Sequence, residues 1–350
     1  MIKTIFLAII SQMYFLYVKI RHFLYDIGAI GSVEFDIPVI CVGNITVGGT
    51  GKTPMVELIL QYHMSTYNVA ILSRGYGRSS KGYIEVKCEH DYRKVGDEPL
   101  QIKRKFPNAV VVVCEDRVEG VERLRKSHPE INMVIMDDGF QHRRITPKIN
   151  VIIIDATRPV HHDHALPLGS LRDTPSSLDR ANIFIVSKCP EGMTSIDRRV
   201  LQNNLISKAY QRIYFTRYES LTPEPLYPDI ADSTMIFDHN TEVIAVAGIG
   251  NPTPFVESLD GQYKKVDQIL FKDHHVYHMS DIKQMQSMTD RYPEAIIVMT
   301  EKDAVKLMGK STIPAELRGK LYYMPIDISF LVEDSKNAFL NHLSYEIKHS

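Results

Sequence analysis

The sequence predicts an α/β fold built on a doubly wound, mostly parallel sheet, with a second, smaller α/β domain after it. Short apolar runs rich in β-branched residues recur along the chain, helix-length segments separate them, and a glycine-rich loop follows the first run. The runs hardly alternate in polarity, which is typical of strands buried on both faces of a parallel sheet.

Each element follows from this pattern. The runs expected to form the first sheet are 38–42 (PVICV), 69–73 (VAILS), 109–114 (AVVVVC), 133–137 (MVIMD), 151–155 (VIIID) and 183–187 (IFIVS), with crossover helices at 53–64 and 117–127. The prolines of 221–229 (LTPEPLYPD) predict a linker. Strand-like runs resume at 243–248, 268–271, 295–300 and 321–326, with a helix start at Ser280-Asp281.

We therefore expect three parts: an N-terminal helical region (1–30), a core domain (31–220) and a smaller C-terminal α/β domain (221–350). The sequence leaves open whether the C-terminal tail packs back on the core. A chain of 350 residues with 44% apolar residues is long enough for two buried cores.

The net charge of −1 gives no overall basic field, so we expect no nucleic-acid partner. The four cysteines stand far apart without a CxxC pair, which predicts neither disulfides nor a zinc site and fits a reducing cytosol. Nothing in the sequence indicates an obligate protein partner.

The N-terminus differs from the rest of the chain. Residues 4–18 (TIFLAIISQMYFLYV) are strongly apolar, and Lys19 and Arg21 follow them. The run is shorter than the roughly 20 residues that span a bilayer, and no signal-peptide cleavage motif follows it. Two interpretations remain open: an amphipathic helix lying in a membrane interface, or a core helix packed on the domain's own sheet.

A phosphate-binding loop follows the first strand. Residues 46–53 fit the pattern GxxxxGK[ST], except that Thr46 takes the first glycine position. Lys52 is expected to bridge the β- and γ-phosphates of a nucleotide and the Thr53 hydroxyl to hold magnesium. The residues expected to bind the phosphates are Thr46, Val47, Gly48, Gly49, Thr50, Gly51, Lys52 and Thr53. Strand, loop and helix in this order predict a P-loop NTPase-like core.

The second half of a nucleotide site is expected at the end of strand 133–137. Asp137 and Asp138 stand there, and either carboxylate could hold Mg²⁺. ATP is favoured over GTP because 187–190 (SKCP) has a proline where a guanine-reading carboxylate would stand. The expected cofactors are therefore ATP and Mg²⁺.

Together these motifs resemble those of the tetraacyldisaccharide 4′-kinases, which phosphorylate the lipid A precursor. The matching segments are GNITVGGTGKTP (43–54), LSRGYGR (72–78), VGDEP (95–99), DR (116–117), DDGFQHR (137–143), LPLGSLRD (166–173), SKCP (187–190), AGIGNP (247–252), DHH (273–275) and TEKDAVK (300–306). Each is short, but their shared order over nearly the whole chain is specific.

The resemblance implies an enzyme that transfers the γ-phosphate of ATP to the 4′-hydroxyl of tetraacyldisaccharide 1-phosphate, forming lipid IVA. It also implies a lipid substrate and attachment of the N-terminal helix to the cytoplasmic face of the bacterial inner membrane.

The resemblance also points to catalytic residues. Asp97 is implied to be the base and His274 its partner, with His275 as the alternative; the residues alone would indicate only a turn and a surface histidine. Lys302 and Asp303 are interpreted as a structural ion pair outside catalysis.

The residues expected to bind the acceptor are Arg74, Arg117, Gln141 and Asp173. The two arginines follow strand ends, at the edge where α/β sheets collect ligands, and guanidinium groups suit phosphate. Asp173 stands in a Leu-Arg-Asp segment where the family usually has Leu-Arg-Glu, which leaves its exact role open.

Two other functions remain open on the sequence. A nucleotide-driven switch or metallochaperone would share the phosphate loop and the aspartate pair but would need neither Asp97 nor His274. A soluble small-molecule kinase would bury the N-terminal helix.

Overall fold

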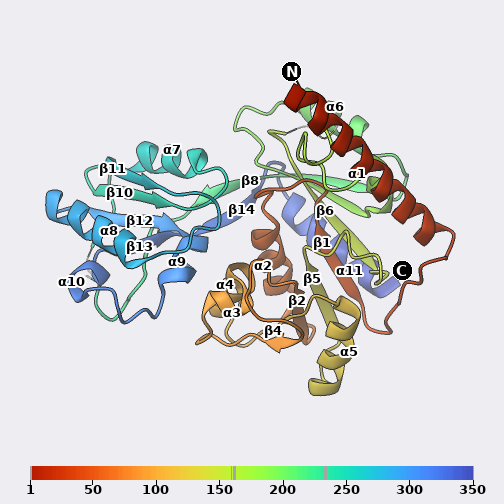
Figure 1. The fold of residues 1–350 in the computed structure, drawn as a ribbon, viewed down its shortest axis with the longest axis horizontal. Coiled ribbons are helices and arrows are strands. Elements are labelled where there is room, and N and C mark those ends of the chain that lie inside the picture. The colour runs from red at the N-terminus through yellow and green to blue at the C-terminus, as the bar shows by residue number, and fades with distance from the viewer. Residues whose placement is uncertain (1, 159, 161–162, 232–234, 350) are drawn as a thin grey trace.

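The computed structural model describes every residue except 1, 159, 161–162, 232–234 and 350, and it shows two sheets side by side (Figure 1). Within these described residues the larger sheet has nine strands. Their order is β14 (Ile326–Phe330), β8 (Arg212–Ser220), β7 (Ile183–Ser187), β6 (Ile149–Asp155), β1 (Val39–Gly43), β5 (Met133–Asp137), β2 (Val69–Ser73), β4 (Val110–Val113) and β3 (Ile84–Glu85). All pairs from β8 to β4 are parallel, and the edge strands β14 and β3 run antiparallel.

Both faces of this sheet are buried, as the unalternated apolar runs predict. In β1, Val39 and Cys41 enter one core cluster, whereas Ile40 and Val42 enter the other. The first cluster includes α5 (Arg117–Ser127), and the second includes α2 (Lys52–His63) and α4 (Asp97–Lys105). The short helices α3 (Tyr92–Val95) and η2 (Pro175–Arg180) and the helix α6 (Ser195–Leu205) complete this part of the chain. The expectation of a doubly wound, mostly parallel sheet is confirmed.

The smaller sheet has five strands among the described residues. Their order is β11 (Lys264–Leu270), β10 (Glu242–Ala247), β12 (Ile296–Thr300), β13 (Leu321–Met324) and β9 (Glu224–Pro225), with helices α7 (Thr253–Gln262), α8 (Met279–Arg291), α9 (Glu301–Leu307) and α10 (Ala315–Arg318). The strand β9 lies inside the proline-rich segment expected to be a linker and pairs antiparallel with β13. Reading 221–229 purely as a linker is therefore wrong, because its middle joins the small sheet as an edge strand, where proline is tolerated.

The end of the chain returns to the larger sheet. The strand β14 pairs with β8, and α11 (Ser335–His349) buries Phe339 and Leu343 in the same core cluster as α2. Residues after 325 therefore pack with the first sheet, which decides the question that the sequence leaves open about the tail.

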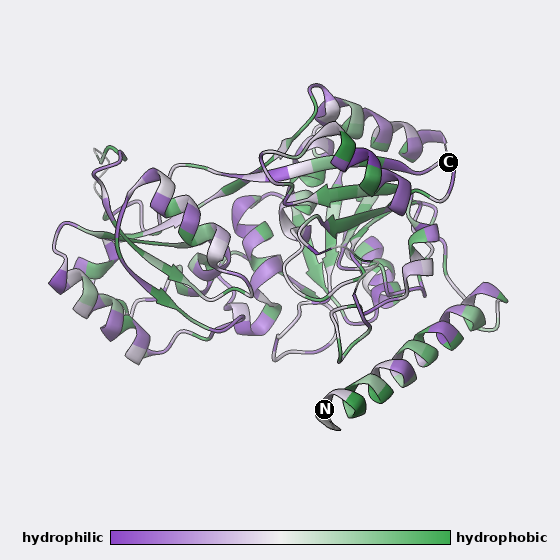
Figure 2. Cartoon of the chain, turned by 90° about the horizontal axis from the view of Figure 1, so that it is seen from above, coloured by the Kyte–Doolittle hydropathy of each residue, from purple (hydrophilic) through white to green (hydrophobic). Residues whose placement is uncertain are grey.

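The N-terminal helix α1 (Ile2–Asp26) lies at the outside of the molecule, and Figure 2 shows its ribbon beyond the sheets and their helices. Among the side chains of α1 that the structure describes, only Ser11, Val18 and His22 are buried. Large apolar side chains on the opposite side are more than half exposed: Ile5, Phe6, Ile9, Met13, Leu16, Tyr17, Ile20 and Phe23. The alternative of a core helix is therefore wrong, since the helix turns its apolar side outward.

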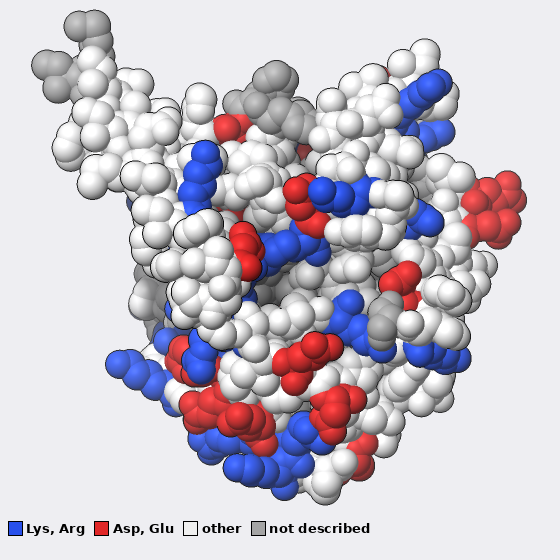
Figure 3. All heavy atoms as spheres, turned by 90° about the vertical axis from the view of Figure 1, so that its right-hand side faces the viewer, with Lys and Arg blue, Asp and Glu red and all other residues white. Residues whose placement is uncertain are grey.

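Away from α1, the surface carries charged side chains of both signs. Figure 3 shows lysine and arginine interspersed with aspartate and glutamate over one face. By length and composition α1 could also cross a membrane.

The packing of α11 gives a stability prediction. Phe339 is fully buried, and its ring lies 5.4 Å from that of Tyr214 on β8. We expect Phe339→Ala to lower the free energy of unfolding by about 3–5 kcal/mol because it leaves a cavity between helix and sheet. Urea unfolding followed by circular dichroism measures it, with the exposed Lys348→Ala on the same helix as the control. Equal stability of the two variants would contradict docking of α11.

Candidate active site

The segment between β1 and α2 forms a tight loop. Gly48 and Gly51 have φ values of 97° and 90°, which residues with a side chain rarely adopt. At Gly51 the space is also closed, since an added Cβ would lie 1.3 Å from the Tyr218 hydroxyl. Glycine is therefore required there both by the backbone and by the packing of β8.

The carbonyl groups of this loop are held by the neighbouring strands. The Lys188 ammonium donates to the Gly49 carbonyl, and the Ser187 and Tyr218 hydroxyls donate to the Thr50 carbonyl at 2.9 and 3.3 Å. These contacts fix the conformation of a glycine-rich loop, and successive backbone N–H groups of such a loop can form an anion-binding nest. The N-terminus of α2, which begins at Lys52, adds its positive end to the same place.

Two adjacent carboxyl groups at the end of β5 have opposite properties. Burial, together with Glu98 and Asp138, raises the pKa of Asp137 to about 7. Burial also opposes ionisation of Asp138, but Lys52 and Arg172 outweigh it and lower the pKa of Asp138 to about 2. Lys52 Nζ lies 3.7 Å from Asp138 Oδ1. Asp138 is thus ionised and paired, whereas Asp137 forms no ion pair with any residue that the structure describes.

The arrangement around Asp137 fits a magnesium ion better than a metal held by protein alone. The Ser73 hydroxyl donates to Asp137 Oδ2 at 3.2 Å, while the buried Oδ1 has no hydrogen-bond partner among the described residues. No cluster of three or more His, Cys, Asp or Glu side chains suited to a metal occurs in the described part of the chain. Mg²⁺ needs few protein ligands because it keeps waters and binds nucleotide phosphates. Asp137 and Thr53 are the groups that could hold it.

Asp97 and His274 meet across the boundary between the two sheets. Asp97 is the first residue of α4, and its Oδ2 lies 3.2 Å from His274 Nδ1 of the segment after β11. Lys302, at the start of α9, places its Nζ 3.8 Å from the same oxygen and 3.2 Å from Glu98 Oε1. Burial disfavours the ionised carboxyl group, but His274 and Lys302 outweigh it and lower the pKa of Asp97 to about 2.

His275 has a different role from His274. Its ring stacks on Phe271, with centroids 4.0 Å apart, and its Nε2 lies 2.9 Å from Asp281. The geometry therefore pairs His274, and not His275, with Asp97.

Lys302 and Asp303 do not form the ion pair expected from the sequence. Asp303 contacts the buried Lys306 at 3.1 Å and accepts from the Gly248 amide at 2.8 Å, whereas Lys302 faces Asp97 and Glu98. Their separation follows from α9, in which consecutive residues point to different sides of the helix. The cation beside Asp97 is a residue that the sequence interpretation set aside.

The four residues expected to bind the acceptor lie in different environments. Arg117 is almost fully buried, and burial lowers the pKa of its guanidinium, with Asp138 and Asp137 opposing the shift; Arg74 at the end of β2 is exposed. Gln141 and Asp173 face the protein: Gln141 Nε2 donates to the Asn44 carbonyl at 2.8 Å and lies 3.3 Å from Asp173 Oδ2. Arg117 therefore supplies positive charge near the aspartate pair, and the charge of Arg74 lies close enough to act on Arg117. Gln141 and Asp173 brace the loops.

Arg172 was not singled out from the sequence, although it stands in the LPLGSLRD segment. Its guanidinium donates to both carboxylate oxygens of Asp138 and to the Asn44 side chain, and Asn44 donates in turn to the Thr50 hydroxyl at 2.7 Å. Arg172 thus links Asp138 to the phosphate loop. The one feature of the sequence that points to Arg172 is its place next to Asp173.

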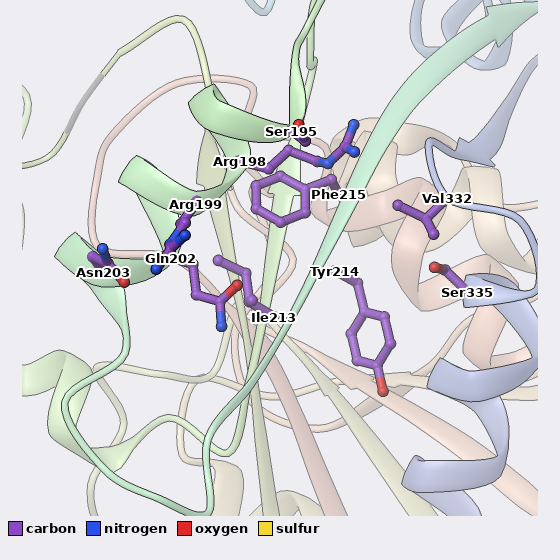
Figure 4. A pocket seen from close by; sticks show the side chains of 10 residues that line it. All are labelled: Ser195, Arg198, Arg199, Gln202, Asn203, Ile213, Tyr214, Phe215, Val332 and Ser335. Carbon is purple, nitrogen blue, oxygen red and sulfur yellow. The ribbon is translucent and has the colours of Figure 1, made fainter.

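A surface cavity of about 420 Å³ lies elsewhere, between α6, β8 and the segment before α11, and Figure 4 shows the ten side chains that line it. It contains Arg198 and Arg199 but no acidic side chain and no residue of the phosphate loop. A cavity without these groups lacks what phosphoryl transfer requires, so the site described above is the better candidate.

Comparison with known proteins agrees with this geometry. The family model described as tetraacyldisaccharide-1-P 4′-kinase, or LpxK, matches residues 3–345. The chain belongs to this family. Membership makes the chain a kinase of lipid A biosynthesis and decides against the nucleotide-driven switch or metallochaperone.

Individual members of the LpxK family are similar over most of their length. The tetraacyldisaccharide 4′-kinase of Phocaeicola vulgatus is 36% identical over 343 residues, covering 96% of this chain and 93% of that protein. The same enzyme of Cytophaga hutchinsonii is 37% identical over 331 residues, covering 94% and 91%. A crystal structure of LpxK from Aquifex aeolicus in complex with ATP matches with a TM-score of 0.71, 25% identity and 97% coverage of both chains.

The contact of Lys302 with two carboxylates gives a prediction about stability and pH. We expect Lys302→Met to lower the free energy of unfolding by about 1–2 kcal/mol at pH 7, because Asp97 and Glu98 lose their cation. The pKa of folded Asp97 is lowered, so its stabilising effect is present above the ordinary pKa of 3.8 and is lost as the pH falls toward 2. The difference between variant and wild type should therefore narrow below pH 3.

Urea unfolding at several pH values measures this difference. Lys302→Arg, which keeps the charge, should retain most of the stability, and the exposed Lys283→Met controls for loss of a surface lysine. A loss that stays constant down to pH 2 would contradict pairing with Asp97.

Proposed function

We propose that the chain transfers the γ-phosphate of ATP to the 4′-hydroxyl of tetraacyldisaccharide 1-phosphate, with Mg²⁺, at the cytoplasmic face of the bacterial inner membrane. The observation that supports this best is the position of the first turn of α4. Asp97 faces His274 of the small domain, and the neighbouring Glu98 lies close enough to raise the pKa of Asp137 beside the phosphate loop. One turn of helix therefore joins the acid–base pair to the phosphate site.

The phosphate loop provides the nucleotide site. Lys52 and the backbone amides of residues 46–53, apart from that of Val47, which donates to the Ser170 carbonyl at 2.8 Å, would bind the β- and γ-phosphates. Arg117 and Arg74 would add positive charge for the transferring phosphate or the acceptor's own phosphate. Mg²⁺, held by Asp137 and Thr53, would neutralise charge on the phosphates. The Aquifex aeolicus relative crystallised with ATP supports ATP as the donor.

The Asp97–His274 pair would accept the proton of the attacking hydroxyl. Asp97 is ionised at neutral pH because its pKa is about 2, yet a carboxylate of such low pKa is a weak base. The imidazole of His274, which Asp97 orients, would share the proton with the carboxylate. Since His274 belongs to the small domain, the pair is complete only when the two domains are in contact.

The outer face of α1 supports binding at a lipid surface. Its exposed apolar side chains form a continuous stripe along the helix, and such a stripe is stable in the acyl boundary of a membrane and unfavourable in water. A lipid acceptor is held in the same surface. We therefore assign α1 as an interfacial membrane helix.

The proposed reaction is tested by transfer of labelled phosphate from ATP to tetraacyldisaccharide 1-phosphate in detergent micelles, with and without magnesium. We expect magnesium-dependent labelling of the lipid, and Lys52→Ala should lower turnover at least ~100-fold because it removes a charge that stabilises the transition state. The control variant is Lys208→Ala, because Lys208 is a half-exposed lysine outside the phosphate loop. Release of free phosphate alone by folded protein would contradict the proposal.

The membrane helix is tested by replacing Phe6, Met13 and Leu16 together by serine. Each side chain is more than half exposed, so folding should be unaffected, whereas partition into vesicles containing anionic phospholipid should fall at least tenfold. The matched control is Ile196→Ser with Val200→Ser on α6, which are equally exposed but lie outside α1. Sedimentation with vesicles measures the fraction of each variant that is bound to lipid. Equal partition of both variants and wild type would contradict the assignment.

A further inference from the structure

The inner face of α1 is polar and contacts two loops of the candidate active site. The Ser11 hydroxyl donates to the Ala165 carbonyl at 2.7 Å, and the Tyr14 hydroxyl donates to the Arg172 carbonyl at 2.9 Å. About two turns further along, Arg21 donates to the Gln141 carbonyl at 2.8 Å. The helix is thus held on the body by directional hydrogen bonds to the loop that follows the aspartate pair and to the loop that follows β6.

The tightest of these contacts is between His22 and Asp173. His22 Nε2 lies 2.6 Å from Asp173 Oδ1, and the two side chains are 11% and 1% exposed. Arg143 Nη1 lies 3.1 Å from His22 Nδ1. A guanidinium can only donate, so Nδ1 accepts, and the ring proton of the neutral imidazole stands on Nε2 and is donated to Asp173.

Asp173 is fully engaged by protein groups. Its Oδ1 also accepts from the Thr174 amide at 2.8 Å, and its Oδ2 lies 3.3 Å from Gln141 Nε2 and 3.5 Å from Arg180 Nη2. This carboxylate therefore fixes the backbone at residue 173 and leaves no oxygen free for a ligand. Its neighbour Arg172 is the residue that reaches Asp138 and Asn44.

Arg172 is consequently held from α1 on both sides. Tyr14 binds its carbonyl group, and His22 binds the side chain of the next residue. From Arg172 the contacts continue to Asp138 beside Lys52 and, through Asn44, to Thr50 of the phosphate loop. A path of direct hydrogen bonds and ion pairs joins α1 to the phosphate site.

We propose that His22 and Tyr14 are positioning residues for phosphoryl transfer: α1 aligns Arg172, and through it Asp138 and the phosphate loop, while its outer face lies in the lipid surface. The inference rests on the proposed function. It assigns α1 a second role, separable from anchoring, because the residues of the two faces are different. The same helix would thereby bind the membrane through its outer face and align the site through its inner face.

The experiment uses the full-length protein and separates anchoring from alignment by kinetics. Transfer of label from ATP to the lipid acceptor is measured in mixed micelles up to saturating lipid for wild type, Tyr14→Phe, His22→Leu, His22→Gln and the exposed control Gln12→Ala. Vesicle partition and thermal unfolding are measured on the same proteins.

We expect His22→Leu to lower kcat about tenfold at saturating lipid, with vesicle partition unchanged, since its apolar outer face is intact. Tyr14→Phe, which removes only one hydroxyl, should lower kcat about threefold. Glutamine can still donate to Asp173, so His22→Gln should recover most of the activity, and Gln12→Ala should match wild type. If His22→Leu does not fold, Tyr14→Phe and His22→Gln carry the test.

Two results would overturn the inference while leaving the proposed function intact. One is a kcat equal to wild type for both Tyr14→Phe and His22→Leu. The other is a deficit that disappears at saturating lipid, since this would show that the inner face serves anchoring alone. Absence of lipid labelling by wild-type protein would instead contradict the proposed function itself.

Discussion

The turn at Asp137-Asp138 is the constraint on which the rest of the site depends. Asp138 has a φ of 53°, a left-handed conformation that costs a residue with a side chain of order 1 kcal/mol. This conformation directs Asp137 into the sheet and Asp138 toward Lys52 and Arg172. Two adjacent carboxylates that pointed in the same direction would repel each other. The turn points them in different directions, so that Asp138 is paired with cations and Asp137 is not.

That separation ties together segments far apart in the sequence. Arg172 and Lys52 both approach Asp138, so the loop after β6 and the phosphate loop share one anion. The Asp138 carboxylate is partly buried, so its ionised form depends on these cations. Loss of either cation would therefore disturb the other loop as well, and the three segments act as a unit.

A second group of charges sets how the small domain meets the large one. Lys105 of α4 lies 2.6 Å from Glu57 of α2 and 3.3 Å from Glu301 of α9. Burial raises the pKa of both carboxyl groups, although the charge of Lys105 acts to lower it. One lysine shared by two carboxylates holds a phosphate-loop helix and a small-domain helix in a fixed relation. The same helices present Asp97 and Lys302 to each other, so this contact determines whether His274 reaches Asp97.

The central strands and the phosphate loop could be predicted because their signals are local. Runs such as 110–113 are apolar over their whole length, and 46–53 contains its own glycines and lysine. The strand β8 escaped prediction because it mixes polar and aromatic residues and is only partly buried. The pairing of Asp97 with His274 and the identity of the acceptor could be named only through resemblance. Asp97 and His274 are remote in the sequence, and neither residue signals the other.

The contacts of α1 show the same limit most clearly. His22 and Asp173 are separated by 151 positions, and nothing beside either residue signals the other. The helix itself gives the reason for their meeting: Ser11 and His22 are eleven residues apart, so its inner face spans ~17 Å, enough to reach from the loop at 165 to that at 173. Hydrogen bonds to a helix exposed to water on its outer side gain little net stability. On the proposed placement, lipid covers the apolar stripe and its burial would stabilise the position of the helix. The hydrogen bonds from Ser11, Tyr14 and His22 would then fix the loops relative to the helix. A lipid surface would then supply both the acceptor and the platform on which the loops around Asp138 are aligned.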